Sequence, residues 1–386
     1  MSDIHNLFTE LIRVAIGNQV CLSRVPSAEE WQTLYAFAEK QTLVGVCFAG
    51  IQKLPKELHP PKGLLLRWFA IAEQIKQRNR LVNARACELQ KLLENDGLRA
   101  CVLKGQGVAR LYGFNDNGND NDDGNLNVND KLGTYRQSGD IDVWVDGERD
   151  DTIRYMRGHY KCGRAVIHHI DVEVFDDVPV EVHFVPSFAY SLPRYRAYRR
   201  FFNEYKDECF VPTGLGFCMP SLGFNVVYLL MHIFRHVFHE GIGLRQLMDY
   251  YFVLRNVNVN LNLNVNVNDN HKRNGNAHKV LKEMGLLRFA GAVMYVEREV
   301  FGLQKEYMIC EPDEKAGRFL MNEIKRAGNF GQYDPRIHDA HSGGLMKLYL
   351  KNVRRLFGMV RYYPSEVLWA PIWKIWHFVW RKTKGY

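Results

Sequence analysis

The stretch Arg136–Val145 constrains the fold of this chain more than any other, because its second half alternates acidic and apolar residues. In an extended strand successive side chains point to opposite faces. Asp140 and Asp142 would therefore share one face, while Ile141 and Val143 enter a core. Two close carboxylates repel each other unless a cation lies between them, and hard oxygen ligands favour a divalent ion, usually Mg²⁺. The sequence predicts a strand that carries a Mg²⁺ site.

Two further motifs flank this strand. Upstream, Val102-Leu103-Lys104-Gly105 predicts a short strand that turns into a helix. A glycine at such a turn lets a phosphate approach the backbone N–H groups. Downstream, Val180-Glu181-Val182-His183-Phe184 predicts a second alternating strand, in which Glu181 and His183 share a face. Glu181 is thus a candidate for a third carboxylate at the metal site.

The strand before Glu181 offers two competing acids, Asp171 and Glu173. We expect the two strands to form a hairpin over a two-residue turn at 176–177, which would pair Val172 with Glu181. Directly opposed residues share a face, so this register sends both competitors to the other side of the sheet. A shift of one residue would reverse the result, and the identity of the third acid therefore stays open.

Together these motifs resemble the nucleotidyltransferases of the DNA polymerase beta type and, among them, a branch of uncharacterised bacterial nucleotidyltransferases. The resemblance extends over roughly residues 31–381, with motif-level matches at Leu103–Gly113, Arg136–Val145, Val180–His183 and His232–Asp249. It implies an α+β fold, in which a small mixed nucleotidyltransferase-like β-sheet is flanked by N-terminal and C-terminal helical regions. It also implies Mg²⁺-dependent transfer of a nucleoside monophosphate from a nucleoside triphosphate to an acceptor hydroxyl, with release of pyrophosphate.

The resemblance assigns roles to individual residues. Asp140, Asp142 and Glu181 would be the catalytic residues and would bind one or two Mg²⁺ ions, and Glu181 could also act as general base. The nucleotide would be bound by a larger group, namely Lys104, Gly105, Arg136, Ser138, Gly139, His183, His236 and Arg245. Gln106 follows the turn glycine, whereas the wider superfamily has Gly-Gly or Gly-Ser. This departure leaves open a catalytically inactive nucleotidyltransferase-like module that binds nucleotide or docks to a partner.

A histidine-rich segment follows in the second half of the chain. His232, His236 and His239 fall on one helix face at i, i+4 and i+7. A structural or substrate-facing role fits this spacing better than a zinc site, because no cysteine motif accompanies it. Arg245 and Asp249 lie at i and i+4, and we expect them to form an ion pair along their helix.

The chain divides into four regions by composition. These are an N-terminal helical region at 1–96, a nucleotidyltransferase-like α/β core at 97–215 with a low-complexity insert at 115–130, a helical domain at 216–345 with an Asn-rich insert at 256–270, and a basic aromatic tail at 346–386. Both inserts are expected to be surface loops, because an Asn-rich face packs poorly in a sheet and loop closure tolerates added length.

The tail has a distinct charge. It holds nine Lys or Arg and one acid, Glu366, a net charge of +8 that equals the excess of the whole chain. We therefore expect it to contact an anionic surface. Trp369, Trp373, Trp376 and Trp380 form one helical stripe within it. The ordinary interpretation is burial against neighbouring helices, and the alternatives are a membrane surface or nucleic acid.

Composition limits the expected cellular compartment of the protein. The eight cysteines include no Cys-x-x-Cys pair, which favours a reduced, cytoplasmic compartment over a disulfide framework. No stretch reaches the roughly 20 apolar residues of a transmembrane segment. The expected partners are a nucleoside triphosphate and an acceptor, whether small molecule, protein or RNA, that the sequence does not identify.

Overall fold

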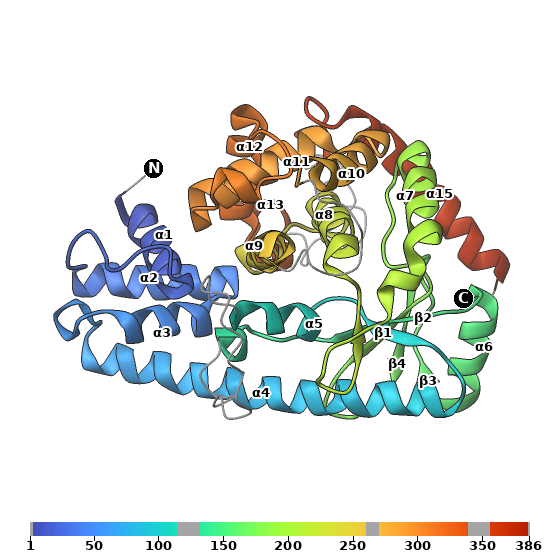
Figure 1. Cartoon of the computed structure of the whole chain (residues 1–386), viewed down its shortest axis with the longest axis horizontal. Coiled ribbons are helices and arrows are strands. Elements are labelled where there is room, and N and C mark those ends of the chain that lie inside the picture. The colour runs from blue at the N-terminus through green and yellow to red at the C-terminus, as the bar shows by residue number, and fades with distance from the viewer. Residues whose placement is uncertain (1–2, 114–131, 260–269, 339–355, 385–386) are drawn as a thin grey trace.

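The computed structural model of the chain describes residues 3–113, 132–259, 270–338 and 356–384 (Figure 1). The predicted insert at 115–130 lies outside the described residues, as do positions 260–269 of the second insert. The start of the second insert was predicted wrongly. Residues 256–259 end the helix α9 (Leu244–Val259), and the buried Asn256 amide donates to the backbone oxygens of Leu111 and Phe252. These two bonds from the amide nitrogen tie Asn256 to its own helix and to the segment at Leu111.

The N-terminal part is helical, as predicted. It contains α1 (Asp3–Ile16), α2 (Ala28–Gln41), α3 (Val44–Lys53) and α4 (Lys62–Asn95). Ser27 and Glu30 form a capping box that starts α2. Helix α4 is 34 residues long and runs beneath both the other N-terminal helices and the sheet (Figure 1). It therefore supports both halves of this region.

The main sheet has five strands in the order β1-β2-β5-β4-β3. They are β1 (Ala100–Val102), β2 (Ile141–Val145), β3 (Lys161–Cys162), β4 (His169–Glu173) and β5 (Val180–His183). Strands β2 and β5 are parallel and the other pairs are antiparallel, so the sheet is mixed. A second sheet pairs β6 (Val211–Pro212) with β7 (Cys218–Met219). The expected α+β fold with a small mixed sheet is confirmed.

The two faces of the main sheet differ in chemistry. Ile141, Val143 and Val182 belong to a core that also contains Leu89 of α4 and Met156 of α6 (Arg149–His159). The opposite face carries the alternate residues of the same strands. Trp144 on that face packs in the other core of the molecule, with residues of α7 (Leu192–Tyr205) and α8 (Leu222–His239). The acidic residues of β2 and β5 therefore face helices rather than open solvent.

The expected hairpin register is wrong. Val172 pairs with Val180, and Asp171 pairs with Glu181, across a connection longer than two residues. The apolar pattern explains this register, because it places Ile170 opposite Val182 and keeps the aliphatic side chains on one face. Asp171 consequently shares the face of Glu181, contrary to the prediction.

Helices cover the polar face and one edge of the sheet. After α8 and α9 come α10 (Asn270–Glu283), α11 (Leu287–Val296), α12 (Glu314–Ala327), α13 (Pro335–His338) and α15 (Pro364–Lys384). Helix α8 lies above the sheet, and α15 descends along the edge of the molecule toward α6 (Figure 1). Within the described ranges no helix combines the length and apolarity needed to span a bilayer.

Candidate active site

Asp142 and Glu181 face each other from neighbouring strands, because the parallel register of β2 and β5 makes them Cα partners. His183 lies two residues further along β5, and its Nε2 is 2.9 Å from Asp142 Oδ1 and 3.4 Å from Glu181 Oε2. One ligand-type atom from each of the three residues falls within 4.8 Å of the others. The alternation that was read from the sequence thus assembles two carboxylates and an imidazole at one point of the sheet.

Lys104 joins this group from the end of β1. Its Nζ is 3.0 Å from Asp142 Oδ1, and the Asp142 side chain is only 2% exposed. Burial alone would raise the pKa of Asp142, but Lys104 and His183 lower it below its ordinary value. Burial likewise opposes the charge of Lys104, yet Asp142 and the other nearby acids raise its pKa. The site therefore holds a buried, ionised lysine–aspartate pair.

Asp140 precedes β2 and is partly buried at the mouth of the same site. Repulsion from Asp142, together with burial, raises the pKa of Asp140 to about 6. The three-residue cluster of ligand atoms does not include it. Asp140 is thus close enough to feel the charge of Asp142 but lies outside the tightest group.

The strand register bears on which acid is the third carboxylate of the site. Glu181 is on β5, directly beside Asp142, whereas Asp171 is one strand further away on β4 and its side chain is 65% exposed. His183 lowers the pKa of Glu181 against the opposing effect of burial. Asp171 forms a second cluster with His169 and Glu181. Glu173 is exposed and pairs with Lys161 at the outer end of β4.

Sequence reasoning missed a cluster of basic groups above the carboxylates. Arg235 of α8 donates through Nη1 to His168 Nε2 at 2.5 Å and through Nη2 to His236 Nε2 at 2.8 Å. His168 in turn lies 3.0 Å from His169, which neighbours Glu181 and His183. Arg235 falls on the helix face already noted, three residues after His232, and this spacing could have identified it.

The histidines of this cluster stay neutral. Burial and the charge of Arg235 lower the pKa of His168 and His236 well below the ordinary value. His236 also contacts Glu240 Oε1 through Nδ1 at 2.5 Å. His232 is buried as well, with its pKa lowered by burial and by Lys104, while His239 at the end of α8 is exposed. The predicted histidine face is therefore divided between the interior and the surface.

The expected ion pair between Arg245 and Asp249 is replaced by a longer-range one. Asp249 accepts from Arg136 Nε at 2.6 Å, from Arg136 Nη2 at 2.7 Å and from the Tyr112 hydroxyl at 2.6 Å. Arg245 donates to the backbone oxygen of Gln137 at 2.9 Å instead. Arg136 was predicted as a nucleotide ligand, but its guanidinium is buried and bound to Asp249. The two arginines thus hold the loop that leads to Asp140.

The same loop leaves groups available to a ligand. The Ser138 hydroxyl is buried and has no hydrogen-bond partner within the part of the chain that is described. A Cβ added at Gly105 or at Gly139 would meet no atom within 4 Å, so the backbone at both glycines borders open space. Gly105 has a φ of +64°, a conformation that favours glycine. Burial and Arg136 lower the pKa of Arg245 to about 10.

The donor set fits a divalent cation. Carboxylate oxygens suit Mg²⁺ and Mn²⁺. Asp142 and Glu181 raise the pKa of His183 against the effect of burial, so its ring would have to release a proton before a nitrogen could add affinity for first-row transition ions. His183 Nδ1 is buried without a partner among the described residues, while Nε2 contacts both carboxylates, so Nδ1 is the ring nitrogen left for a further contact. Surrounding cations from β1, α8 and α9 complement a polyanionic substrate.

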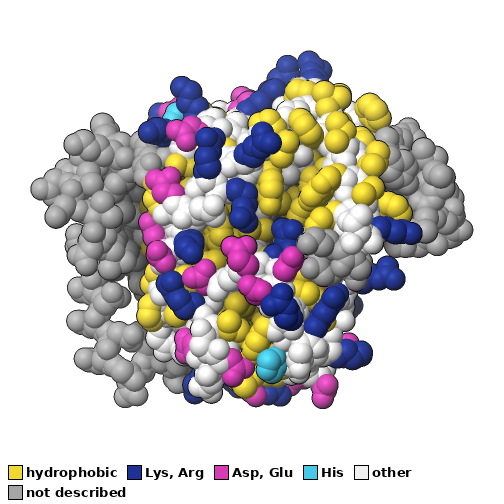
Figure 2. Space-filling model, turned by 90° about the vertical axis from the view of Figure 1, so that its right-hand side faces the viewer, with side chains coloured by type: hydrophobic (Ala, Val, Ile, Leu, Met, Phe, Trp, Pro, Cys, Tyr) yellow, Lys and Arg dark blue, Asp and Glu magenta, His cyan; other side chains and the backbone are white. Residues whose placement is uncertain are grey.

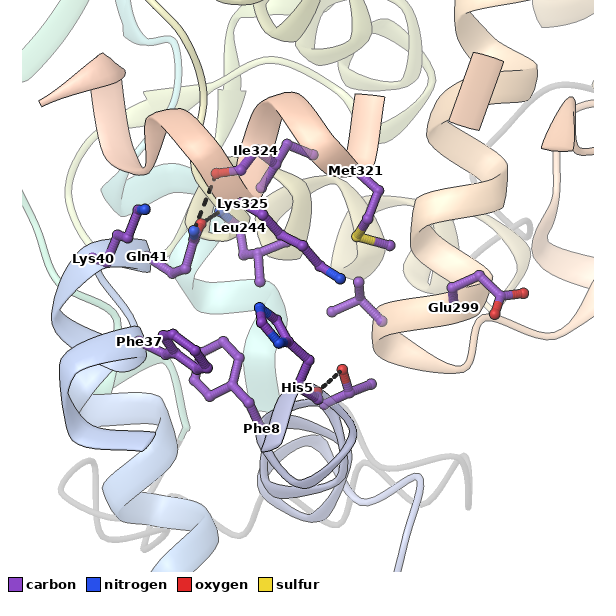
Figure 3. Close-up of a pocket in the computed structure, with 12 residues that line it drawn as sticks. His5, Phe8, Phe37, Lys40, Gln41, Leu244, Glu299, Met321, Ile324 and Lys325 are labelled. Atoms are coloured by element: carbon purple, nitrogen blue, oxygen red, sulfur yellow. Dashed lines mark hydrogen bonds between the residues drawn. The ribbon is translucent and has the colours of Figure 1, made fainter. Parts of the chain in front are cut away.

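A small apolar cavity lies elsewhere in the molecule (Figure 3). Its lining includes Phe8, Phe37 and Met321 and none of the acidic residues described above. Its volume of about 50 Å³ is far below the roughly 300–1,000 Å³ of sites that enclose small-molecule ligands. It is a packing gap between α1, α2 and α12 rather than a substrate site.

Comparison with known proteins agrees with this geometry. A family model described as "Uncharacterised nucleotidyltransferase" matches residues 27–116 and 133–302, more than half of the chain. The match is interrupted where the first low-complexity insert was predicted, and it includes all the residues of the carboxylate site. No curated protein and no solved structure matches the chain.

Proposed function

The chain belongs to the uncharacterised nucleotidyltransferase family, and from this premise we propose a specific reaction for it. It transfers a nucleoside monophosphate from a nucleoside triphosphate to an acceptor hydroxyl, releases pyrophosphate and depends on Mg²⁺. Family membership supports the general transfer activity. The metal dependence, the hydroxyl acceptor and the leaving pyrophosphate are our extension.

The observation that carries the proposal is the pairing of Asp142 with Glu181 beside His183. In the proposed role Asp142 and Glu181 are the principal metal ligands, with Asp140 as a further one. These side chains would hold a divalent ion, which would supply positive charge to offset the charge that develops on the transferred phosphate. Glu181 is ionised because of His183, so it is able to accept the proton of an acceptor hydroxyl.

Lys104 has a role that follows from its ion pair. Its charge balances Asp142 when no cation is bound, at a separation of 3.0 Å. The same ammonium group carries three donors, so it could also contact a phosphate oxygen of a substrate bound beside Asp142.

The nucleotide phosphates would lie between the sheet and helices α8 and α9. Gly105 and Gly139 offer open backbone, and the unpartnered Ser138 hydroxyl offers one hydrogen bond. Arg245, whose Nε has no partner among the described residues, would supply a further contact from α9. Both ring nitrogens of His236 already contact Arg235 and Glu240, so His236 could act only by positioning Arg235. Arg136 is no longer among the proposed ligands, because Asp249 uses its guanidinium.

The test is release of pyrophosphate from labelled nucleoside triphosphates in the presence of Mg²⁺ and a panel of hydroxyl-bearing acceptors. Asp142→Asn should lower turnover at least about 100-fold, because loss of one charge-stabilising group typically costs about 10²–10³-fold. The matched control is Asp151→Asn on the exposed surface of α6, which should retain full turnover.

Binding must be measured in parallel. Titration of Mg²⁺ and a triphosphate into the same preparation tests the catalytically inactive alternative, since both functions allow binding but only the transferase yields pyrophosphate. Equal turnover of Asp142→Asn and the unmodified chain would refute the proposed site. Tight binding with no pyrophosphate from any acceptor would support the binding module instead.

A further inference from the structure

Helix α15 has one side anchored in the molecule. Glu366 is buried, pairs with Arg194 of α7 and accepts from the backbone N–H of Tyr190 at 2.5 Å. One turn further, Ala370 is fully buried, and Trp373 stacks on Phe188 with ring centroids 4.8 Å apart. The tryptophan stripe seen in the sequence therefore lies along the border of this packed side, and its expected burial applies only to part of it.

The outward side of α15 is apolar, which the tryptophan pattern did not reveal. Leu368, Ile372, Ile375 and Val379 recur at i, i+4, i+7 and i+11, and their exposed fractions lie between 52% and 67%. Trp376 and Phe378 flank this stripe and are about half exposed. Figure 2 looks onto this side of the molecule and shows a broad area of hydrophobic side chains with Lys and Arg around it, above a group of Asp and Glu side chains. An apolar face of this extent marks an interaction surface.

The charge of the same region is one-sided. Glu366 is the only acid in residues 346–386, and its side chain is 2% exposed and neutralised by Arg194. Lys382 continues the outward stripe one turn beyond Val379, is exposed and lies 5.4 Å from the ring centroid of Phe378. Arg361 is exposed before the helix begins. The described surface of the tail thus combines aliphatic side chains with positive charge alone.

This combination selects among possible partners. Nucleic acid would be bound by stacking on aromatic faces, but the outward stripe is mainly aliphatic, and Trp373 is already stacked within the protein. An anionic bilayer satisfies both features, because aliphatic and Trp side chains enter the acyl boundary while Lys and Arg meet lipid phosphates. We propose that α15 lies in the plane of an anionic membrane surface and attaches the protein there through Leu368, Ile372, Ile375, Trp376 and Val379.

The proposal is independent of the catalytic one and is tested by co-sedimentation of the full chain with vesicles. Phosphatidylcholine vesicles that contain about one third phosphatidylglycerol should bind it, and pure phosphatidylcholine should bind it much more weakly. Ile372→Gln combined with Ile375→Gln should lower the partition coefficient at least about ten-fold, because two buried aliphatic side chains are lost.

The chain offers matched controls. Val25 and Leu66 are equally exposed apolar residues outside α15, with exposed fractions of 60% and 58%, and Val25→Gln with Leu66→Gln should bind as the unmodified chain does. Lys382→Glu should weaken binding to anionic vesicles, whereas Lys56→Glu, also exposed, should not. Quenching of tryptophan fluorescence by lipids brominated near the acyl boundary provides a second readout, which the Ile372/Ile375 double variant should lose.

Several outcomes would overturn the proposal. Unchanged vesicle binding by the double variant, or equal binding to neutral and anionic vesicles, would each exclude it. Self-association of the unmodified chain that the double variant abolishes, without vesicle binding, would assign the outward face of α15 to a second copy instead. An unchanged thermal unfolding temperature in every variant would show that a loss of vesicle binding comes from the altered surface and not from unfolding.

Discussion

Asp142 is the central charged residue of the candidate site. It is buried, yet its carboxylate is held ionised by Lys104 on one side and His183 on the other. Removal of either partner would leave a buried charge uncompensated, which is more costly than the pair itself is favourable. The two partners therefore keep the Asp142 carboxylate ionised, which is the form that can bind a cation.

The imidazole of His183 gives a prediction on metal preference. A donor set with one nitrogen should bind Mn²⁺ more tightly than Mg²⁺, since affinity rises from hard oxygen-only sites toward first-row transition ions. His183→Gln should weaken Mn²⁺ binding by about 10–100-fold, whether the ring contacts the ion or orients Asp142. Calorimetric titration of each ion measures both effects.

The control for this titration is His159→Gln, which changes an exposed histidine on α6. It should leave the affinities for both ions unchanged. A preference for Mg²⁺ over Mn²⁺ that persists in the unmodified chain would contradict a nitrogen ligand at this site.

At the scale of elements, the sequence predicted those features that depend on neighbouring residues. The strand β2 and the alternation of Asp142 with apolar neighbours both follow from a few adjacent residues. The register between β4 and β5 depends on the length of the turn that joins them. This turn was predicted to have two residues and is longer. The pairing of Arg136 with Asp249 joins residues 113 positions apart, and no local spacing announces it. Arg245, four residues from Asp249, was the nearer but wrong partner.

That long-range pair ties α9 to the loop before β2, and its loss should be costly. Asp249→Ala leaves the buried Arg136 guanidinium without a counter-charge and should lower the free energy of unfolding by about 3–5 kcal/mol. Denaturant unfolding followed by circular dichroism measures the change. Glu314→Ala removes an exposed pair with Arg318 on α12 and should cost less than about 1 kcal/mol. A similar cost for the two variants would show that the buried pair does not anchor the loop.

At the scale of the whole molecule, one buried acid makes stability depend on pH. Glu297 is fully buried, and neither carboxyl oxygen has a partner in the described parts of the chain. Burial raises the pKa of Glu297 well above its ordinary 4.5, so the folded protein keeps a proton that the unfolded chain releases. Its contribution is therefore full below pH 4.5 and is lost as the pH rises toward the folded pKa.

Glu297→Gln should remove this dependence, because an amide carries no proton that titrates. Over the range in which Glu297 titrates, the unmodified chain should lose up to roughly 1.4 kcal/mol of stability per pH unit relative to the variant. Thermal unfolding at pH 5 and pH 8 compares the two, with exposed Glu57→Gln as the control. A variant that loses stability at pH 8 would mean that the ionised carboxylate is needed.

The length of α4 has a final consequence. Trp68 and Ile75 belong to the core shared with α1–α3, while Val82 and Leu89 belong to the core under the sheet. If α4 separates from either core, apolar residues of both cores become exposed to water. The N-terminal helices and the strand of Asp142 are thus thermodynamically coupled through α4. A substitution that destabilises the N-terminal helices should therefore also destabilise the sheet that carries Asp142.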